Sequence, residues 1–185
     1  MNKIKNENIT IAILGRGKTG KTSAFTAFTH HNLATTKALE PTIENTCQKE
    51  IELSPKKRAR LIDFCPSDKL IHDENKIQEN IKELIEASDI ILLMTDFNGL
   101  NNIDIETCRI AKSHNIPIII VINKIDMASI PDDFLKKIKT LTPDIIFTSL
   151  RFDKDFVSKT KNKILKIFPE KFNLRKIIKK LFIQK

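Results

Sequence analysis

Short apolar runs alternate with amphipathic segments along most of the chain. The aliphatic runs predict buried strands at 9–14, 90–94 and 117–122. Apolar residues elsewhere recur at helical spacing, which predicts helices at about 20–31, 75–87, 102–115, 131–140 and 154–168. Further strands are expected at 46–53 and 58–64, which a polar turn with Pro55 joins, and at 144–149.

Apolar strands that alternate with amphipathic helices are typical of a mostly parallel sheet with helices on both faces. The early strand pair adds one antiparallel edge strand to this sheet. The pattern therefore predicts an α/β protein, a three-layer α/β/α sandwich around a mostly parallel six-stranded sheet. We expect residues 1–170 to form this domain, because no repeat or low-complexity linker divides them.

Composition changes the picture mainly at the C-terminal end. The 185 residues carry a net charge of +9, and no apolar run approaches the length of a membrane span. The first eight residues lack the apolar core of a signal peptide, and three widely spaced cysteines offer no disulfide framework. These features favour a cytoplasmic protein. Between 171 and 185 the chain holds six basic residues and no acid.

That basic segment also shows a helical pattern. Its apolar positions are Leu174, Ile177, Ile178, Leu181 and Phe182. We therefore predict a basic amphipathic helix over 171–185. Three roles remain open: packing on the domain, lying on an anionic membrane surface such as the inner face of the cell membrane, or binding RNA or an acidic partner.

One glycine-rich loop follows the first predicted strand. Residues 15–22 fit G-x-x-x-x-G-K-[ST], a loop whose backbone N–H groups cradle phosphates at a helix N-terminus. Lys21 is expected to reach the β- and γ-phosphates, and the Thr22 hydroxyl to ligate Mg²⁺. The residues predicted to contact the nucleotide here are Gly15, Arg16, Gly17, Lys18, Thr19, Gly20, Lys21, Thr22 and Ser23.

A second motif follows the strand at 117–122 and reads Asn123-Lys124-Ile125-Asp126. The Asp126 carboxylate can accept two hydrogen bonds from the ring N–H and exocyclic amine of guanine, a donor pair that adenine lacks. Asn123 can brace the neighbouring loops, and the stem of Lys124 can cover the base. Ligands in open α/β sheets bind at the carboxyl ends of such strands. The sequence thus predicts a guanine-nucleotide site.

The two motifs together resemble the P-loop GTPases, and the resemblance covers about residues 9–168. Within that class the chain is similar to the Era/TrmE-type G domains, and most similar to the G domain of the hydrogenase maturase HydF. The stretches that carry this likeness are Gly15-Arg16, 49–55 before Leu61-Ile62-Asp63, and 122–126. HydF-type proteins carry further domains with cluster-binding cysteines, which this sequence lacks, so the maturase activity is not implied. The resemblance implies the P-loop NTPase fold, GTP or GDP with Mg²⁺, and a protein effector that reads the GTP state.

The resemblance also implies roles for residues outside the two motifs. Thr42 would be the switch I threonine, a Mg²⁺ ligand and with Lys21 a catalytic group, although Thr35, Thr36 and Thr46 are alternatives. Asp63 would hold Mg²⁺, usually through water. Ser149 and Leu150 would form the guanine loop, where the family usually has alanine in place of Leu150. Asp96 is expected to be structural, and Arg16 a solvated loop residue rather than a catalytic finger.

Two departures from the family pattern bear on activity. The family has Asp-x-x-Gly where this chain has Asp63-Phe64-Cys65-Pro66, and proline has no N–H to offer the γ-phosphate. Lys18 replaces the asparagine that helps to bind an activating K⁺, so K⁺ stays an open cofactor. Two functions therefore compete: a switch that hydrolyses GTP slowly, and a GTP-binding interaction module with little or no hydrolysis. Asp126 argues against a P-loop ATPase or kinase, and a nucleotide-dependent homodimer remains open.

Overall fold

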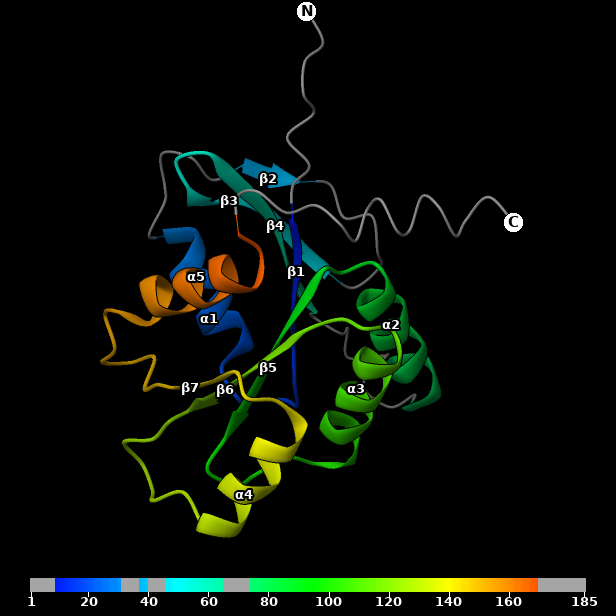
Figure 1. Ribbon diagram of the computed structural model, residues 1–185, viewed down its shortest axis with the longest axis vertical. Coiled ribbons are helices and arrows are strands. Elements are labelled where there is room, and N and C mark those ends of the chain that lie inside the picture. Colours follow the sequence, from blue (N-terminus) through cyan, green and yellow to red (C-terminus); the bar gives the residue numbers. More distant parts are fainter. Residues whose placement is uncertain (1–8, 31–36, 40–45, 65–73, 170–185) are drawn as a thin grey trace, which may run out of the picture.

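A computed structural model describes residues 9–30, 37–39, 46–64 and 74–169 of the chain. Helices and strands alternate along them as the apolar pattern predicts (Figure 1). The strands are β1 (Ile9–Leu14), β2 (Lys37–Leu39), β3 (Thr46–Ser54), β4 (Lys57–Phe64), β5 (Ile90–Asp96), β6 (Ile118–Asn123) and β7 (Ile145–Phe147). The helices are α1 (Lys21–His30), α2 (Glu74–Glu86), α3 (Asn102–Ser113), α4 (Asp132–Leu141) and α5 (Phe156–Ile167).

The described strands form one sheet in the order β2-β3-β4-β1-β5-β6-β7. Strand β1 pairs in parallel with β4 and β5, and the parallel arrangement continues through β6 to β7. Strand β3 is antiparallel to both of its neighbours. The predicted fold class is confirmed, because the six predicted strands form a mostly parallel sheet with one antiparallel strand. The short strand β2, which the pattern did not predict, extends the sheet beyond β3.

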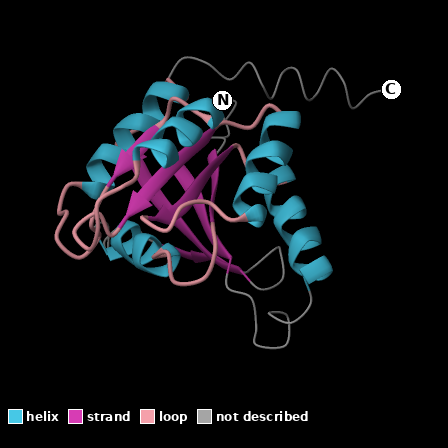
Figure 2. Ribbon diagram, turned by 90° about the horizontal axis from the view of Figure 1, so that it is seen from below, coloured by secondary structure: helices cyan, strands magenta, loops and turns pink. Residues whose placement is uncertain are grey.

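Alternate residues of the strands supply two cores, one on each face of the sheet. Ile11 and Ile13 of β1 pack with Phe28 of α1 and Phe156 of α5, and the rings of Phe28 and Phe156 meet edge to face. On the other face, residues of β1, β5 and β6 pack with α2, α3 and α4. Figure 2 shows the sheet between these two helical layers. Because both faces are covered, the strands are continuously apolar, as parallel sheets require.

The fold brings the ends of the parallel strands to one edge of the sheet. Gly15 follows β1, Asp63 lies next to the end of β4, and Asp96 and Asn123 are the last residues of β5 and β6. Parallel strands place all of these side chains at the same edge, which is where open α/β sheets bind ligands. No helix among the described residues is both long and apolar enough to cross a membrane. Thr42, Pro66 and the predicted helix at 171–185 lie outside the described residues.

Candidate functional site

The glycine-rich loop is held tightly between β1 and its neighbours. Gly15 has a φ of 131°, and a Cβ atom there would overlap the carbonyl oxygen of Met94 on β5. Gly20 has a φ of 104°, and a Cβ atom there would overlap the side-chain amide of Asn123. Both positions therefore need glycine, on grounds of conformation and of space. Contacts with the Met94 backbone of β5 and the Asn123 side chain of β6 therefore determine where the loop lies.

The two side chains at the centre of the loop converge on one carbonyl group. Lys21 donates from Nζ to the carbonyl oxygen of Arg16 at 2.8 Å, and the Thr19 hydroxyl donates to the same oxygen at 2.9 Å. Lys21 is the first residue of α1, so its ammonium group and the helix N-terminus lie at the same end of the loop. The ammonium group, the N–H groups at the helix N-terminus and the helix dipole together favour an anion here.

The predicted metal ligands Thr22 and Asp63 lie side by side. The hydroxyl of Thr22 on α1 donates to Oδ2 of Asp63 on β4 at 3.1 Å, and Asp63 is buried. Among the described residues no group of three or more His, Cys, Asp or Glu side chains could hold a metal. One hydroxyl and one carboxylate are hard oxygen donors that suit Mg²⁺, an ion that takes its other ligands from phosphates and water. The residues present therefore fit Mg²⁺.

Asn123 joins the base motif to two other loops. Its side-chain amide donates to the carbonyl oxygen of Thr19 at 2.9 Å, and its Oδ1 accepts the backbone N–H of Leu150 at 3.0 Å. The next residue, Lys124, adopts a left-handed backbone with a φ of 61°. Asp126 is exposed two residues further on, where its carboxylate can meet a ligand. The bracing role predicted for Asn123 is confirmed.

A third loop, at 148–150, borders the base motif. The hydroxyl of Thr148 donates to Asp153 at 2.9 Å, and Lys159 of α5 lies 3.1 Å from the same carboxylate. Burial raises the pKa of Asp153, but the hydrogen bonds from Lys159 and Thr148 outweigh it, so the pKa lies below its ordinary value. The ionised Asp153 fixes the loop that presents Ser149 and Leu150. No sequence motif marks Asp153, although an acid shortly before a basic helix is a weak signal.

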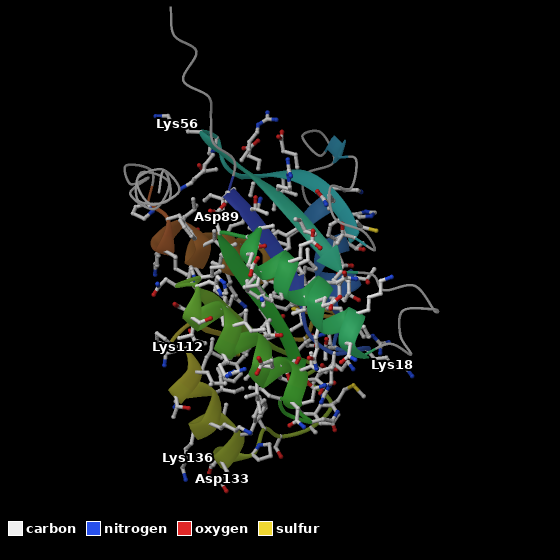
Figure 3. All side chains as sticks on the ribbon, turned by 90° about the vertical axis from the view of Figure 1, so that its right-hand side faces the viewer. Lys18, Lys56, Asp89, Lys112, Asp133 and Lys136 are labelled. Atoms are coloured by element: carbon white, nitrogen blue, oxygen red, sulfur yellow. The ribbon has the colours of Figure 1, made fainter. Side chains whose placement is uncertain are left out.

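Arg16 differs from its prediction. Its guanidinium forms an ion pair with Asp96, and the Asp96 side chain is only 5% exposed. The Arg16 side chain is 23% exposed, so this predicted solvated loop residue is partly buried and takes part in an ion pair. Lys18, by contrast, is exposed and has a φ of 64°. Figure 3 shows Lys18 at the edge of the molecule.

A second buried acid, Asp104 on α3, was not predicted. Its Oδ2 accepts the N–H of Asn101, and its own N–H donates to the Asn101 side chain at 2.8 Å, which forms a capping box at the start of α3. Burial raises the pKa of Asp104, while the charges of Arg16 and Lys21 act in the opposite direction. These two cations belong to the glycine-rich loop, so Asp104 lies close to that loop.

A family model described as "50S ribosome-binding GTPase" matches residues 10–124, which include the glycine-rich loop and the first two residues of the base motif, Asn123 and Lys124. The chain belongs to this GTPase family. No curated protein matches the chain significantly. The family assignment rests on the P-loop and on the strand that leads into Asn123 and Lys124.

Solved structures share the fold of this GTPase. Elongation factor SelB of Methanococcus maripaludis, in complex with the GTP analogue GppNHp, is 22% identical with a TM-score of 0.65, covering 91% of this chain and 35% of SelB. Era, in complex with MgGDPNP and nucleotides 1506–1542 of 16S ribosomal RNA, is 22% identical with a TM-score of 0.63, covering 90% of this chain and 58% of Era. The FeoB G domain of Methanococcus jannaschii is 19% identical with a TM-score of 0.60, covering 85% and 96%.

The chain therefore spans about a third of SelB and less than two thirds of Era, but nearly all of the FeoB G domain. The likeness at these identities concerns the fold.

Proposed function

We propose that this GTPase-family protein binds GTP and GDP with Mg²⁺ and hydrolyses GTP slowly, as a molecular switch. The observation that carries the proposal is the buried amide of Asn123, which ties the base motif to the P-loop through the carbonyl oxygen of Thr19. A phosphate cradle and a guanine-reading carboxylate are useful together only when one nucleotide can span both. The hydrogen bond holds the two motifs at a fixed separation.

Each part of the nucleotide has a matching group in the chain. Lys21 and the N–H groups at the start of α1 face the phosphates, and Asp126 faces the guanine edge. Thr22 and Asp63 would hold Mg²⁺, which supplies positive charge to the phosphate oxygens when it is bound. Thr42 is the proposed switch I ligand. Ser149 and Leu150 are proposed to border the base.

Slow turnover is proposed because of Pro66. Hydrolysis needs donors aimed at the charge that develops on the γ-phosphoryl oxygens, and proline offers no N–H. Loss of one such donor typically costs about 10²–10³ in rate. If the same departure abolishes hydrolysis, the protein is a GTP-binding interaction module, which is the second candidate function.

Turnover measurements separate the two functions. The purified protein is assayed with GTP, GDP and ATP in Na⁺ and in K⁺, and the Pro66→Gly variant is assayed beside it. We expect the unmutated protein to bind GTP and not ATP, to hydrolyse GTP slowly, and to gain rate in Pro66→Gly. Competition by ATP as strong as by GTP would contradict the guanine assignment. Fast turnover by the unmutated protein would contradict the proposed effect of Pro66, and Lys18, Arg16 and Ser67 would then be examined first.

The finer grouping with Era/TrmE-type and HydF-type G domains is also part of the proposal. So is a cytoplasmic location. A protein effector would read the nucleotide state through the segments around Thr42 and Pro66, and a nucleotide-dependent homodimer could supply the group that Pro66 lacks. The K⁺ arm of the assay tests whether Lys18 excludes that ion.

The basic segment 171–185 is proposed to act outside the nucleotide site. It would pack on the G domain 1–170, lie on the anionic inner membrane surface, or bind RNA or an acidic partner; the solved Era structure, of which this chain covers 58%, is in complex with ribosomal RNA. Deletion of 171–185 should leave GTP binding nearly intact and should abolish any salt-sensitive sedimentation with anionic liposomes or RNA. Unfolding of the truncated protein would instead assign the helix to the core.

A further inference from the structure

Asp96 lies between the glycine-rich loop and the base motif, at the end of β5. It is the last residue of β5 and lies opposite Asn123 in the parallel pairing of β5 with β6. On its other side β5 pairs with β1, and Gly15 packs against Met94 of β5. The register of the sheet thus places one side chain between the loop that follows β1 and the loop that follows β6.

The Asp96 carboxylate contacts both loops. Its Oδ1 accepts the guanidinium of Arg16, and its Oδ2 lies 3.3 Å from Nζ of Lys124. Oδ1 also accepts the backbone and side-chain N–H groups of Asn98, each at 3.1 Å. Asp96 is 4% exposed, so these contacts take the place of water around the carboxylate.

Burial raises the pKa of Asp96, but the hydrogen bonds from Asn98 and Lys124 and the charge of Arg16 outweigh it and bring the pKa below its ordinary value. Asp96 is therefore an anion at neutral pH. It separates and neutralises two cations, Arg16 and Lys124, that belong to different loops. Without this charge the two cations would repel each other.

Each cation is connected to a group that meets the nucleotide in the proposed function. The carbonyl oxygen of Arg16 accepts a hydrogen bond from the ammonium of Lys21, so Arg16 contacts the lysine that faces the phosphates in the proposed function. Lys124 lies two residues before Asp126 and holds a left-handed backbone that is unfavourable for lysine. A contact that fixes the Lys124 side chain also supports the turn that presents Asp126.

We propose that Asp96 is a positioning residue that holds the P-loop and the guanine-reading motif in register through its shared contacts with Arg16 and Lys124. This inference rests on the proposed function, because it assigns Asp96 a role in guanine-nucleotide binding. It differs from the direct link through Asn123, since it acts through charge. Its loss should affect the phosphate half and the base half of the nucleotide together.

Competition against a fluorescent GDP tests the two halves separately. The ratio of GDP to GMP affinity reports contacts to the β-phosphate, and the ratio of GDP to IDP affinity reports recognition of the exocyclic amine. Asp96→Asn keeps the size of the side chain and removes its charge. We expect GDP binding to weaken by at least about tenfold and both affinity ratios to fall.

Asp89→Asn is the matched control. Asp89 precedes β5 at the opposite end from Asp96, and its carboxylate accepts the N–H of Thr10 at 2.9 Å (Figure 3). This variant removes a charge and weakens a backbone hydrogen bond far from the glycine-rich loop. It should lower the unfolding temperature and leave both affinity ratios unchanged.

Arg16→Met provides a second variant that does not alter β5. It breaks only the P-loop side of the contact, so the GDP-to-GMP ratio should fall while the GDP-to-IDP ratio stays as in the unmutated protein. If Asp96→Asn does not fold, the difference between the two ratios in Arg16→Met tests the inference instead. Unchanged ratios in Asp96→Asn, or in Arg16→Met when the first variant is unfolded, would overturn the inference. Failure of the unmutated protein to bind GDP would instead overturn the proposed function.

Discussion

The side-chain amide of Asn123 donates a hydrogen bond to the carbonyl oxygen of Thr19 at 2.9 Å, although the two residues are 104 positions apart in the sequence. The same side chain accepts the N–H of Leu150 at 3.0 Å. Asn123 and Thr19 are both buried, so the Thr19 carbonyl has little access to water if this amide is lost. One side chain therefore joins the phosphate loop, the base motif and the loop at 148–150.

Replacement of Asn123 by alanine should weaken both the fold and the nucleotide site. The buried carbonyl of Thr19 and the partly buried N–H of Leu150 would each lose a partner, and an unsatisfied buried group typically costs about 1–3 kcal/mol. We expect a clear fall in the free energy of unfolding in urea and at least a tenfold loss of fluorescent-GDP affinity, about 1.4 kcal/mol. Asn162→Ala on the exposed face of α5 is the control and should change neither quantity.

Replacement by alanine of each of the two lysines in the glycine-rich loop should change GDP affinity by very different amounts. Lys21→Ala removes the ammonium that approaches the Arg16 carbonyl and is expected to face the phosphates, so GDP affinity should fall by at least about tenfold. Lys18 is exposed, and Lys18→Ala should have a small effect. A titration with fluorescent GDP measures both. Equal effects of the two substitutions would contradict the role assigned to Lys21.

Base choice should follow the chemistry of residue 126. Asp126→Asn replaces two acceptor oxygens by one acceptor and one donor amide. Guanine nucleotide binding should weaken by about tenfold or more, and binding of xanthosine diphosphate should improve, because xanthine offers an acceptor where guanine has its amine. Asp132→Asn, at the exposed start of α4, serves as the control. Retained preference for guanine in Asp126→Asn would exclude this carboxylate as the base-reading group.

The buried Asp104 gives a prediction about pH. Burial raises its pKa above the ordinary value of 3.8 in the folded protein, so in that range the folded state binds more protons than the unfolded state. Stability from this group is then greatest at low pH and declines as pH rises through the folded pKa. Because other carboxylates act in the opposite direction, the quantity to follow is the difference between the unmutated protein and Asp104→Asn.

Urea unfolding of both proteins between about pH 4 and pH 8 provides this difference. The free energy of unfolding of the unmutated protein should decline relative to that of Asp104→Asn as pH rises. Parallel profiles would show that burial does not penalise the charged carboxylate. A difference that changes in the other direction would show that the cations Arg16 and Lys21 outweigh burial.

Local patterns in the sequence account for the parts of the structure that local forces decide. The apolar run of β1 is long enough to predict a buried strand, and the glycine-rich loop must adopt its shape wherever such a strand precedes a helix. Strand β2 has only three residues, one of them Lys37, and its pairing with β3 exists only because the neighbouring sheet offers an edge. No periodicity in the sequence could reveal it.

The ion pair between Arg16 and Asp96 shows a different limit of prediction from sequence. Both residues are visible in the sequence, as a polar side chain after each of two buried strands. Their contact depends on the order of strands in the sheet, because β5 must lie beside β1 for the side chains to meet. Hydrophobic pattern predicts which segments are strands but not which strands are neighbours. The pair between Thr148 and Asp153 is local by comparison, yet it lies in a loop without a recognisable motif.

The place of β1 in the sheet also bears on how the chain reaches this structure during synthesis. Ile11 of β1 lies opposite Leu61 of β4 on one side and Ile90 of β5 on the other. Among the described strands β1 is synthesised first, and its second neighbour, β5, is synthesised much later. Until β5 has left the ribosome, β1 has an apolar edge that other chains could pair with. We expect folding of the nascent chain to be delayed until residues beyond 96 have emerged, and chaperones to engage it before then.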